Sequence, residues 1–61
     1  MYAIVSTDYL CEYAGKNGKG EPNFTSRDEL PHKGKRYKTH ERALAVATGL
    51  DCPCRVVETL I

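Results

Sequence analysis

The fold of this chain is decided by one stretch, YKTHERALAVATGL, which spans residues 37–50. Its apolar residues recur at the i, i+3, i+4, i+7 spacing that places side chains on one face of a helix: Ala43, Val46, Ala47 and Leu50. Thr39 is suited to be the N-cap, because its hydroxyl can accept an N–H that the first helical turn leaves unpaired. Gly49 is suited to the left-handed position at which many helices end. The pattern predicts one amphipathic helix, which the rest of the chain needs to close a core.

Short strands are predicted on both sides of this helix. Residues 2–5 carry apolar side chains on both faces, which is typical of a strand in the middle of a sheet. Residues 9–14 predict a second strand, paired with the first as a hairpin, whose side chains on one face are Tyr9, Cys11 and Tyr13. Residues 55–60 predict a final, β-branched strand that can pair with the first.

The segment between the hairpin and the helix has weaker signals. Residues 15–20 contain three glycines and predict a surface loop. Phe24 is expected to enter the core from a short strand, and residues 26–30 are expected to form one helical turn capped by Ser26. The order is therefore β, β, a short β or turn, α, β. The prediction is one α+β domain over residues 1–61, a mainly antiparallel sheet of three or four strands with one helix packed on one face.

Composition limits the kinds of function that the chain can have. With 61 residues, of which 41% are hydrophobic, it is near the lower size limit for folding unaided. The formal net charge of only +1 argues against gross electrostatic binding to nucleic acid or membrane. The charge is unevenly distributed, with −2 on residues 1–31 and +3 on residues 32–61. No apolar run approaches the roughly 20 residues that span a bilayer. Without a signal-peptide pattern, and with an odd number of cysteines, we expect a cytoplasmic protein with free thiols.

The cysteines and histidines define one alternative, a zinc site. Cys52 and Cys54 form a C-x-C pair, and Cys11 with His32 or His40 could complete a tetrahedral set of three cysteines and one histidine. Zinc sites usually have a wider spacing within each pair and a second pair, which this chain lacks. In the competing interpretation, Cys11 and Cys54 are small buried hydrophobes. We expect no metal and no cofactor, and the alternative ligand set is Cys11, Cys52, Cys54 and His40.

Binding is a better expectation than catalysis. No motif fixes a nucleophile beside a base, and a domain of this size has little room for a pocket with supporting residues, so we expect no enzyme activity. A basic segment invites an interpretation as a nucleic-acid interface, with side chains that could neutralise phosphates while Tyr9 or Tyr13 stacks on bases. The basic residues of this segment are Lys33, Lys35, Arg36, Lys38 and Arg42. A basic loop is, however, most often simply solvated.

Four tyrosines in so short a chain favour a protein partner instead, because exposed Tyr beside Arg is the composition of interface hot spots. The predicted partner-binding residues are Tyr9, Tyr13, Lys33, Lys35, Arg36, Lys38 and Arg42. If the basic residues form one continuous surface, nucleic acid gains weight; if they scatter, the tyrosines become the better site. Tyr9 and Tyr13 are the tyrosines expected to be exposed. We expect a monomer or a weak homodimer and no membrane partner.

The chain also resembles short proteins that are common in bacteriophage genomes. The resemblance rests on the opening hairpin, the loop with Phe24-Thr25, the pattern Tyr37-x-Thr39 before an alanine-rich helix, and the Arg55-Val56-Val57-Glu58 strand. Such proteins include host-takeover factors and anti-CRISPR inhibitors. The resemblance implies a small protein that binds and inhibits or modulates a bacterial host protein in the host cytoplasm, with a defence nuclease such as a CRISPR effector among the candidates. The alternative is a small nucleic-acid-binding module that uses residues 32–42.

Overall fold

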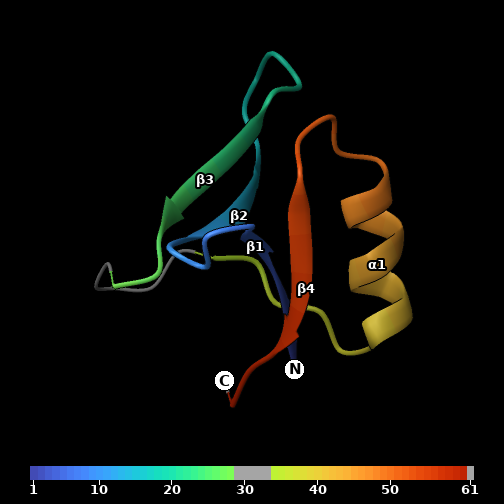
Figure 1. The fold of residues 1–61 in the computed structure, drawn as a ribbon. Coiled ribbons are helices and arrows are strands. Elements are labelled where there is room, and N and C mark those ends of the chain that lie inside the picture. The colour runs from blue at the N-terminus through green and yellow to red at the C-terminus, as the bar shows by residue number, and fades with distance from the viewer. Residues whose placement is uncertain (29–33, 61) are drawn as a thin grey trace.

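The computed structural model describes residues 1–28 and 34–60, and these form one sheet and one helix (Figure 1). The elements are β1 (Tyr2–Ser6), β2 (Cys11–Lys16), β3 (Pro22–Ser26), α1 (His40–Thr48) and β4 (Cys54–Glu58). The sheet is antiparallel in the order β3-β2-β1-β4, and α1 packs against β1 and β4. The predicted α+β fold with one helix on one face is confirmed. No helix of the described residues is long and apolar enough to cross a membrane.

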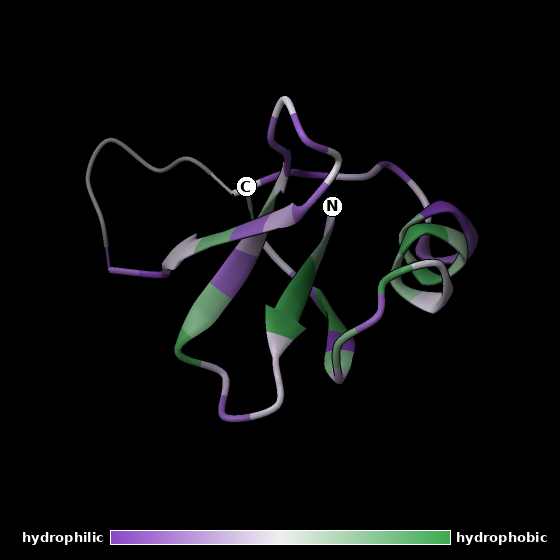
Figure 2. Ribbon diagram, turned by 90° about the horizontal axis from the view of Figure 1, so that it is seen from above, coloured by the Kyte–Doolittle hydropathy of each residue, from purple (hydrophilic) through white to green (hydrophobic). Residues whose placement is uncertain are grey.

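The central strand is β1, as predicted from its apolar residues on both faces. Ala3, Ile4 and Val5 are fully buried, and Figure 2 shows β1 as the strongly hydrophobic strand between its neighbours. β4 pairs with β1 along its whole length, from Tyr2↔Glu58 to Ser6↔Cys54, so the predicted pairing of the last strand with the first is also confirmed.

The second strand begins two residues later than predicted, because a turn takes the residues before it. The Asp8 carboxylate accepts from the N–H of Leu10 at 3.0 Å, and the Ser6 hydroxyl accepts from the N–H of Cys11 at 3.1 Å. Side chains that bond to backbone groups a few residues on favour turns over strands. Tyr9 lies in this turn with a positive φ of 64°, so its predicted place in the strand is wrong.

The hairpin between β2 and β3 is tighter than the predicted glycine loop. Gly15 belongs to β2, where its φ of +104° is one that side chains rarely adopt, and an added Cβ would lie 3.0 Å from Cε of Lys35. Asn17 closes the turn, since its side-chain Oδ1 accepts from the N–H groups of Lys19 and Glu21.

β3 is longer than the short strand that was expected around Phe24. The Phe24 ring lies edge-on to Tyr13 with centroids 5.9 Å apart and packs against the core, as expected. The helical turn expected over residues 26–30 extends outside the described residues.

The helix begins and packs as predicted but ends differently. The Thr39 hydroxyl accepts from the N–H of Arg42 at 3.2 Å, which is the expected N-cap bond. Ala43 is fully buried, and the other members of the apolar face pack against it partly buried: Val46, Ala47 and Leu50. Gly49 has a right-handed conformation with φ −81°, so the expected left-handed ending is wrong.

Residues 34–37 enter a fork between β1 and β2. The two strands are in register at Val5 and Glu12; further along, Tyr37 exchanges two backbone hydrogen bonds of 2.8 Å with Tyr2 of β1. The N–H of Lys35 donates to the carbonyl of Tyr13 in β2, also at 2.8 Å. Tyr37 packs against the core near the helix, and its burial raises its pKa. Because side chains alternate along an extended segment, Arg36 points to the other face of the sheet.

Candidate binding site on the open face of the sheet

The sheet face opposite α1, called the open face below, is defined by the register of the strands. Ile4 and Tyr13 face the helix, so their neighbours along β1 and β2 face the other way. Residues that are paired across strands have their side chains on the same face. The register therefore places six side chains on the open face: Ala3, Val5, Glu12, Thr25, Arg55 and Val57. Three of these, Ala3, Val5 and Glu12, are buried although no helix within residues 1–28 and 34–60 covers them.

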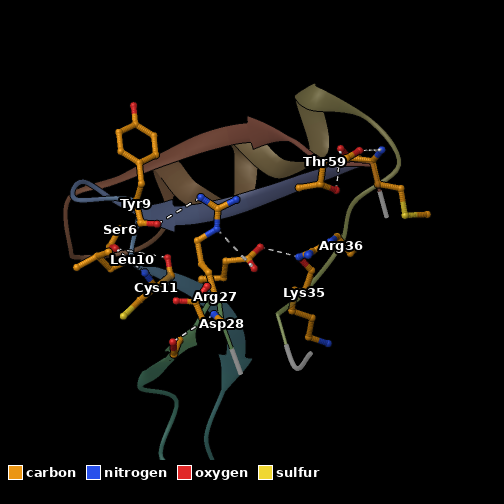
Figure 3. Close-up of polar contacts among 12 residues, drawn as sticks. Ser6, Tyr9, Leu10, Cys11, Arg27, Asp28, Lys35, Arg36 and Thr59 are labelled. Atoms are coloured by element: carbon orange, nitrogen blue, oxygen red, sulfur yellow. Dashed lines mark hydrogen bonds and ion pairs between the residues drawn. The ribbon is translucent and has the colours of Figure 1, made fainter. Parts of the chain in front are cut away.

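Glu12 is the buried polar residue of this face, with 1% of its surface exposed. Nη1 of Arg36 donates to its Oε1 at 2.6 Å, and Nε of Arg27 lies 3.9 Å from its Oε2. Arg27 follows β3 and Arg36 lies in the fork, so the two guanidinium groups approach from opposite sides, as Figure 3 shows. A buried carboxylate is very costly unless it is paired, so these arginines make its burial possible.

The basic residues of the predicted interface do not gather on one surface. Arg36 is largely buried and paired with Glu12 on the open face, whereas Arg42 is exposed on α1, on the other side of the sheet. The aliphatic stem of Lys35 lies over Gly15, and Lys38 is exposed between the fork and the helix. Lys33 lies outside the described residues. Of the two arrangements considered, the described basic residues fit the scattered one, since Arg36 and Arg42 lie on opposite sides of the sheet.

The two tyrosines that were expected to be exposed differ from each other. Tyr13 is 5% exposed and packs in the core, so its predicted exposure is wrong, and it cannot serve as a surface contact without unfolding. Tyr9 is 48% exposed, as predicted.

Tyr9 is held in a strained and well-supported conformation. Its φ of 64° is in the left-handed region, which is a genuine outlier for a bulky side chain. Its carbonyl accepts from Nη1 of Arg27 at 3.3 Å, and Cζ of Arg55 lies 5.6 Å from the centre of its ring. A hydrogen bond from the Ser6 hydroxyl and a second from the N–H of Leu10 lower the pKa of the Asp8 carboxyl that closes the turn. Backbone strain that the surroundings maintain is a feature of functional sites.

The strained turn lies beside an open hollow of about 260 Å³. Its lining combines an aromatic ring, an aliphatic chain and two opposite charges: Tyr9, Leu10, Arg27 and Asp28. Leu10 is 66% exposed, and Figure 3 shows the Tyr9 ring extending away from Ser6 and Leu10. These four residues with Arg55 are called the Tyr9 site below. It offers a partner protein an apolar anchor flanked by charge.

Four of the five residues of the Tyr9 site were missed by the sequence analysis. Leu10 was placed on a strand, and Arg27, Asp28 and Arg55 had no predicted role. One signal could have indicated the site, because Ser6, Thr7 and Asp8 are residue types whose side chains favour turns. An Asp side chain that bonds two residues on would have moved the strand start past Leu10 and left Tyr9 and Leu10 at the tip.

The alternative zinc ligands do not converge. His40 opens α1 with its ring 5.6 Å from that of Tyr2, whereas Cys52 and Cys54 follow the other end of the helix, about 13 Å of helix length away. None of the described residues forms a group of three or more possible metal ligands. Cys54 is instead half-buried against the core, and burial raises the pKa of its thiol. His32 lies outside the described residues.

Comparison with known proteins adds no assignment to this geometry: no family model, curated protein or solved structure matches the chain. The fold and the Tyr9 site together describe a small α+β domain with a strained aromatic turn on the rim of its open face.

Proposed function

We propose that this protein acts by binding another protein through the Tyr9 site, without catalysis. One observation carries the proposal: Tyr9 is half-exposed at positive φ, while Arg27, Arg55 and Asp8 fix the turn that presents it. A rigid aromatic residue beside arginine loses little conformational freedom on binding and is the usual centre of an interface hot spot.

A nucleic-acid partner is the second candidate, and the distribution of charge disfavours it. Phosphate binding requires several cations that can act on one backbone at once. Here Arg36 is paired with a buried carboxylate, and Arg42 lies across the sheet from it. The Tyr9 site itself has two arginines but also Asp28, so it does not have the uniform positive charge of a phosphate-binding groove.

The finer form of the proposal concerns the partner. The resemblance to short bacteriophage proteins favours a bacterial host protein whose activity is inhibited or modulated, with a defence nuclease among the candidates. The place of action would then be the cytoplasm of the host. This form rests on the resemblance, whereas binding through the Tyr9 site rests on geometry.

The test compares matched variants in a capture experiment. Tagged wild-type protein is used to capture partners from bacterial lysate, and enriched proteins are identified by mass spectrometry. Tyr9→Asn removes the ring, while Asn tolerates the left-handed conformation better than other residues, so the turn should stay folded. Thr7→Ala, an exposed change in the same turn, is the control. We expect Tyr9→Asn to weaken the affinity for the captured protein by about 30-fold or more, and the control to change it little.

Two results would contradict the proposal. Full retention of the captured partner by Tyr9→Asn would place the interface elsewhere. Tight binding to DNA or RNA at physiological salt, lost in the double variant Lys38→Ala/Arg42→Ala, would favour the nucleic-acid alternative. Arg36 is not suited to this comparison, because its replacement would leave Glu12 without its closest cation.

A further inference from the structure

The outer edge of β4 is unpaired among the described residues. β4 ends the sheet, and Met1 and Thr59 form a reciprocal backbone pair, with N···O distances of 3.1 and 2.7 Å. Along an antiparallel ladder, every second residue pair exchanges two backbone hydrogen bonds, so Ala3↔Val57 and Val5↔Arg55 are hydrogen-bonded pairs as well. The N–H and C=O groups of the residues between them point outward from the sheet: Cys54, Val56 and Glu58.

The two edges of the sheet differ in how they resist further pairing. β3 begins at Pro22, which has no N–H, and its register with β2 is irregular between Tyr13 and Lys16. Proline and irregular register are devices that protect an edge strand. β4 has neither: its five residues pair regularly with β1, and its β-branched Val56 and Val57 favour strand pairing.

The helix flank beside this edge carries an exposed leucine. At about 100° per residue, a helix whose Ala43 and Ala47 face the sheet directs Arg42 to one flank and Leu44 to the other. Val46 lies one turn on from Arg42 and packs against the core that Ile4 of β1 and Tyr13 of β2 form, so the Arg42 flank faces the fork between these strands. Leu44 therefore lies on the flank toward the outer edge of β4, where it is 49% exposed. Figure 1 shows α1 running alongside β4.

We propose that two copies of this chain pair antiparallel through their β4 edges, about a two-fold axis at Val56, with the Leu44 side chains in contact across that axis. The result is one continuous sheet with both helices on the same face. Paired strands lie about 4.8 Å apart, and α1 lies over both β1 and β4, so the two helix axes come to about 10 Å from each other. That separation is one at which helices pack with their side chains in contact.

A second copy fits this edge better than a strand from another protein does. A single added strand would satisfy the backbone groups of Val56 and Glu58 but would leave Leu44 in water. A second copy satisfies the same groups and also brings its own helix, which buries Leu44 on both sides. At the two-fold axis, the outward N–H and C=O of Val56 can exchange hydrogen bonds with the same groups of the other copy, as an isologous interface requires.

The dimer would make the protein bivalent for its partner. Both Tyr9 sites lie on the open face, away from the helices, and the two-fold axis runs through the sheet from one face to the other. Two identical sites on one rigid sheet raise the apparent affinity for a partner that offers two copies of its own surface. This dimer is independent of the proposed function, since it uses neither Tyr9 nor the open face.

The test measures the molar mass of the untagged protein by sedimentation equilibrium across the micromolar range. Leu44→Glu places like charges against each other at the axis, whereas Ala45→Glu adds the same charge on the solvent side of α1. Glu58→Pro removes an outward N–H, whereas Glu58→Ala keeps it, and neither change touches the ladder with β1. We expect a wild-type dimer whose Kd rises at least about tenfold with Leu44→Glu and with Glu58→Pro, but with neither control.

A mixing experiment guards against variants that fail for other reasons. Leu44→Glu and Leu44→Lys, each weakened alone, should recover a mixed dimer when combined, because opposite charges then meet at the axis. Circular dichroism checks that each variant is folded. A wild-type protein that is monomeric throughout the range, or a dimer that Leu44→Glu and Glu58→Pro leave unchanged, would overturn the proposal.

Discussion

The two faces of the sheet are closed by different kinds of interaction. On the helix side, Ile4 and Tyr13 meet Ala43 in a continuous apolar core. On the open face, Val5 is equally buried, but its cross-strand neighbour is the buried Glu12, which pairs with arginines from segments outside the sheet. The helix of the described residues has nine residues and can cover only one face of the four-stranded sheet, so burial on the other face needs other side chains.

The difference teaches how a very small domain completes its structure. The apolar face needs only hydrophobic residues of suitable size, and the stabilisation is non-directional. The open face contains a short hydrogen bond of 2.6 Å from Nη1 of Arg36 to the buried Glu12 carboxylate, and the loss of Arg36 would weaken the pairing of a buried charge. We therefore expect the helix face to tolerate conservative change and the open face to respond sharply to the loss of a single charge.

The largest effect is expected from Arg36→Ala. The change removes the cation that lies 2.6 Å from the buried Glu12 carboxylate, while Nε of Arg27 stays at 3.9 Å. Breaking a buried pair by removing one partner costs about 3–5 kcal/mol, a large part of the stability of so small a domain. Urea denaturation followed by circular dichroism should show a strongly reduced midpoint or an unfolded protein.

The control for Arg36→Ala removes both charges together. In Glu12→Leu/Arg36→Met, apolar side chains of similar size replace the pair, and such replacements are often neutral or stabilising. We expect this double variant to be much more stable than Arg36→Ala. If the two variants are equally stable, Arg36 does not stabilise the fold through its charge. The open face would then not depend on charge pairing in the way proposed here.

A smaller effect is expected on the helix face from Val46→Asp. Val46 packs partly buried against the core, so the new carboxylate would lie against apolar side chains, although it could still reach water and Arg42 one turn earlier. We expect a loss of about 2 kcal/mol, from the cost of burying an unpaired polar group. Ala45→Asp, on the exposed side of the same helix, should stay within about 0.5 kcal/mol of wild type. If Val46→Asp behaves like this control, the helix face has been assigned wrongly.

The two faces also differ in how much of their structure could be predicted from the sequence. The helix and its core side come from local signals, since Ala43, Val46 and Ala47 repeat at the helical period and Thr39 can cap only a helix that begins directly after it. The central place of β1 comes from its apolar residues on both sides. Short-range sequence patterns therefore predict most of the packing between the helix and the sheet.

The open face depends on contacts that no local pattern shows. Glu12 and Arg36 are 24 residues apart, and they meet because the segment before the helix enters the fork between β1 and β2. Tyr13 was expected on the surface because four tyrosines are many for the core of so short a chain. The strand register, which decides the face on which each side chain lies, was not used for this expectation. Of the Tyr9 site, only the exposure of Tyr9 itself was expected, and its turn was taken for a strand.

The smallest expected effect concerns the strained turn at the rim of the open face, and it compares two replacements of Tyr9. Both Tyr9→Ala and Tyr9→Gly remove the ring and its contact with Arg55, which is worth about 0.5–1 kcal/mol at an exposed site. At φ 64° alanine keeps most of the backbone strain, whereas glycine has none. We expect Tyr9→Gly to be more stable than Tyr9→Ala by roughly 1 kcal/mol and close to wild type, measured as urea midpoints at equal protein concentration. A more stable alanine variant would show that the turn relaxes out of the left-handed region. If Tyr9→Gly is instead the more stable variant, the wild-type tyrosine costs stability through its strained backbone at a position where glycine would fold as well. Such a cost is expected for a residue that is retained for binding.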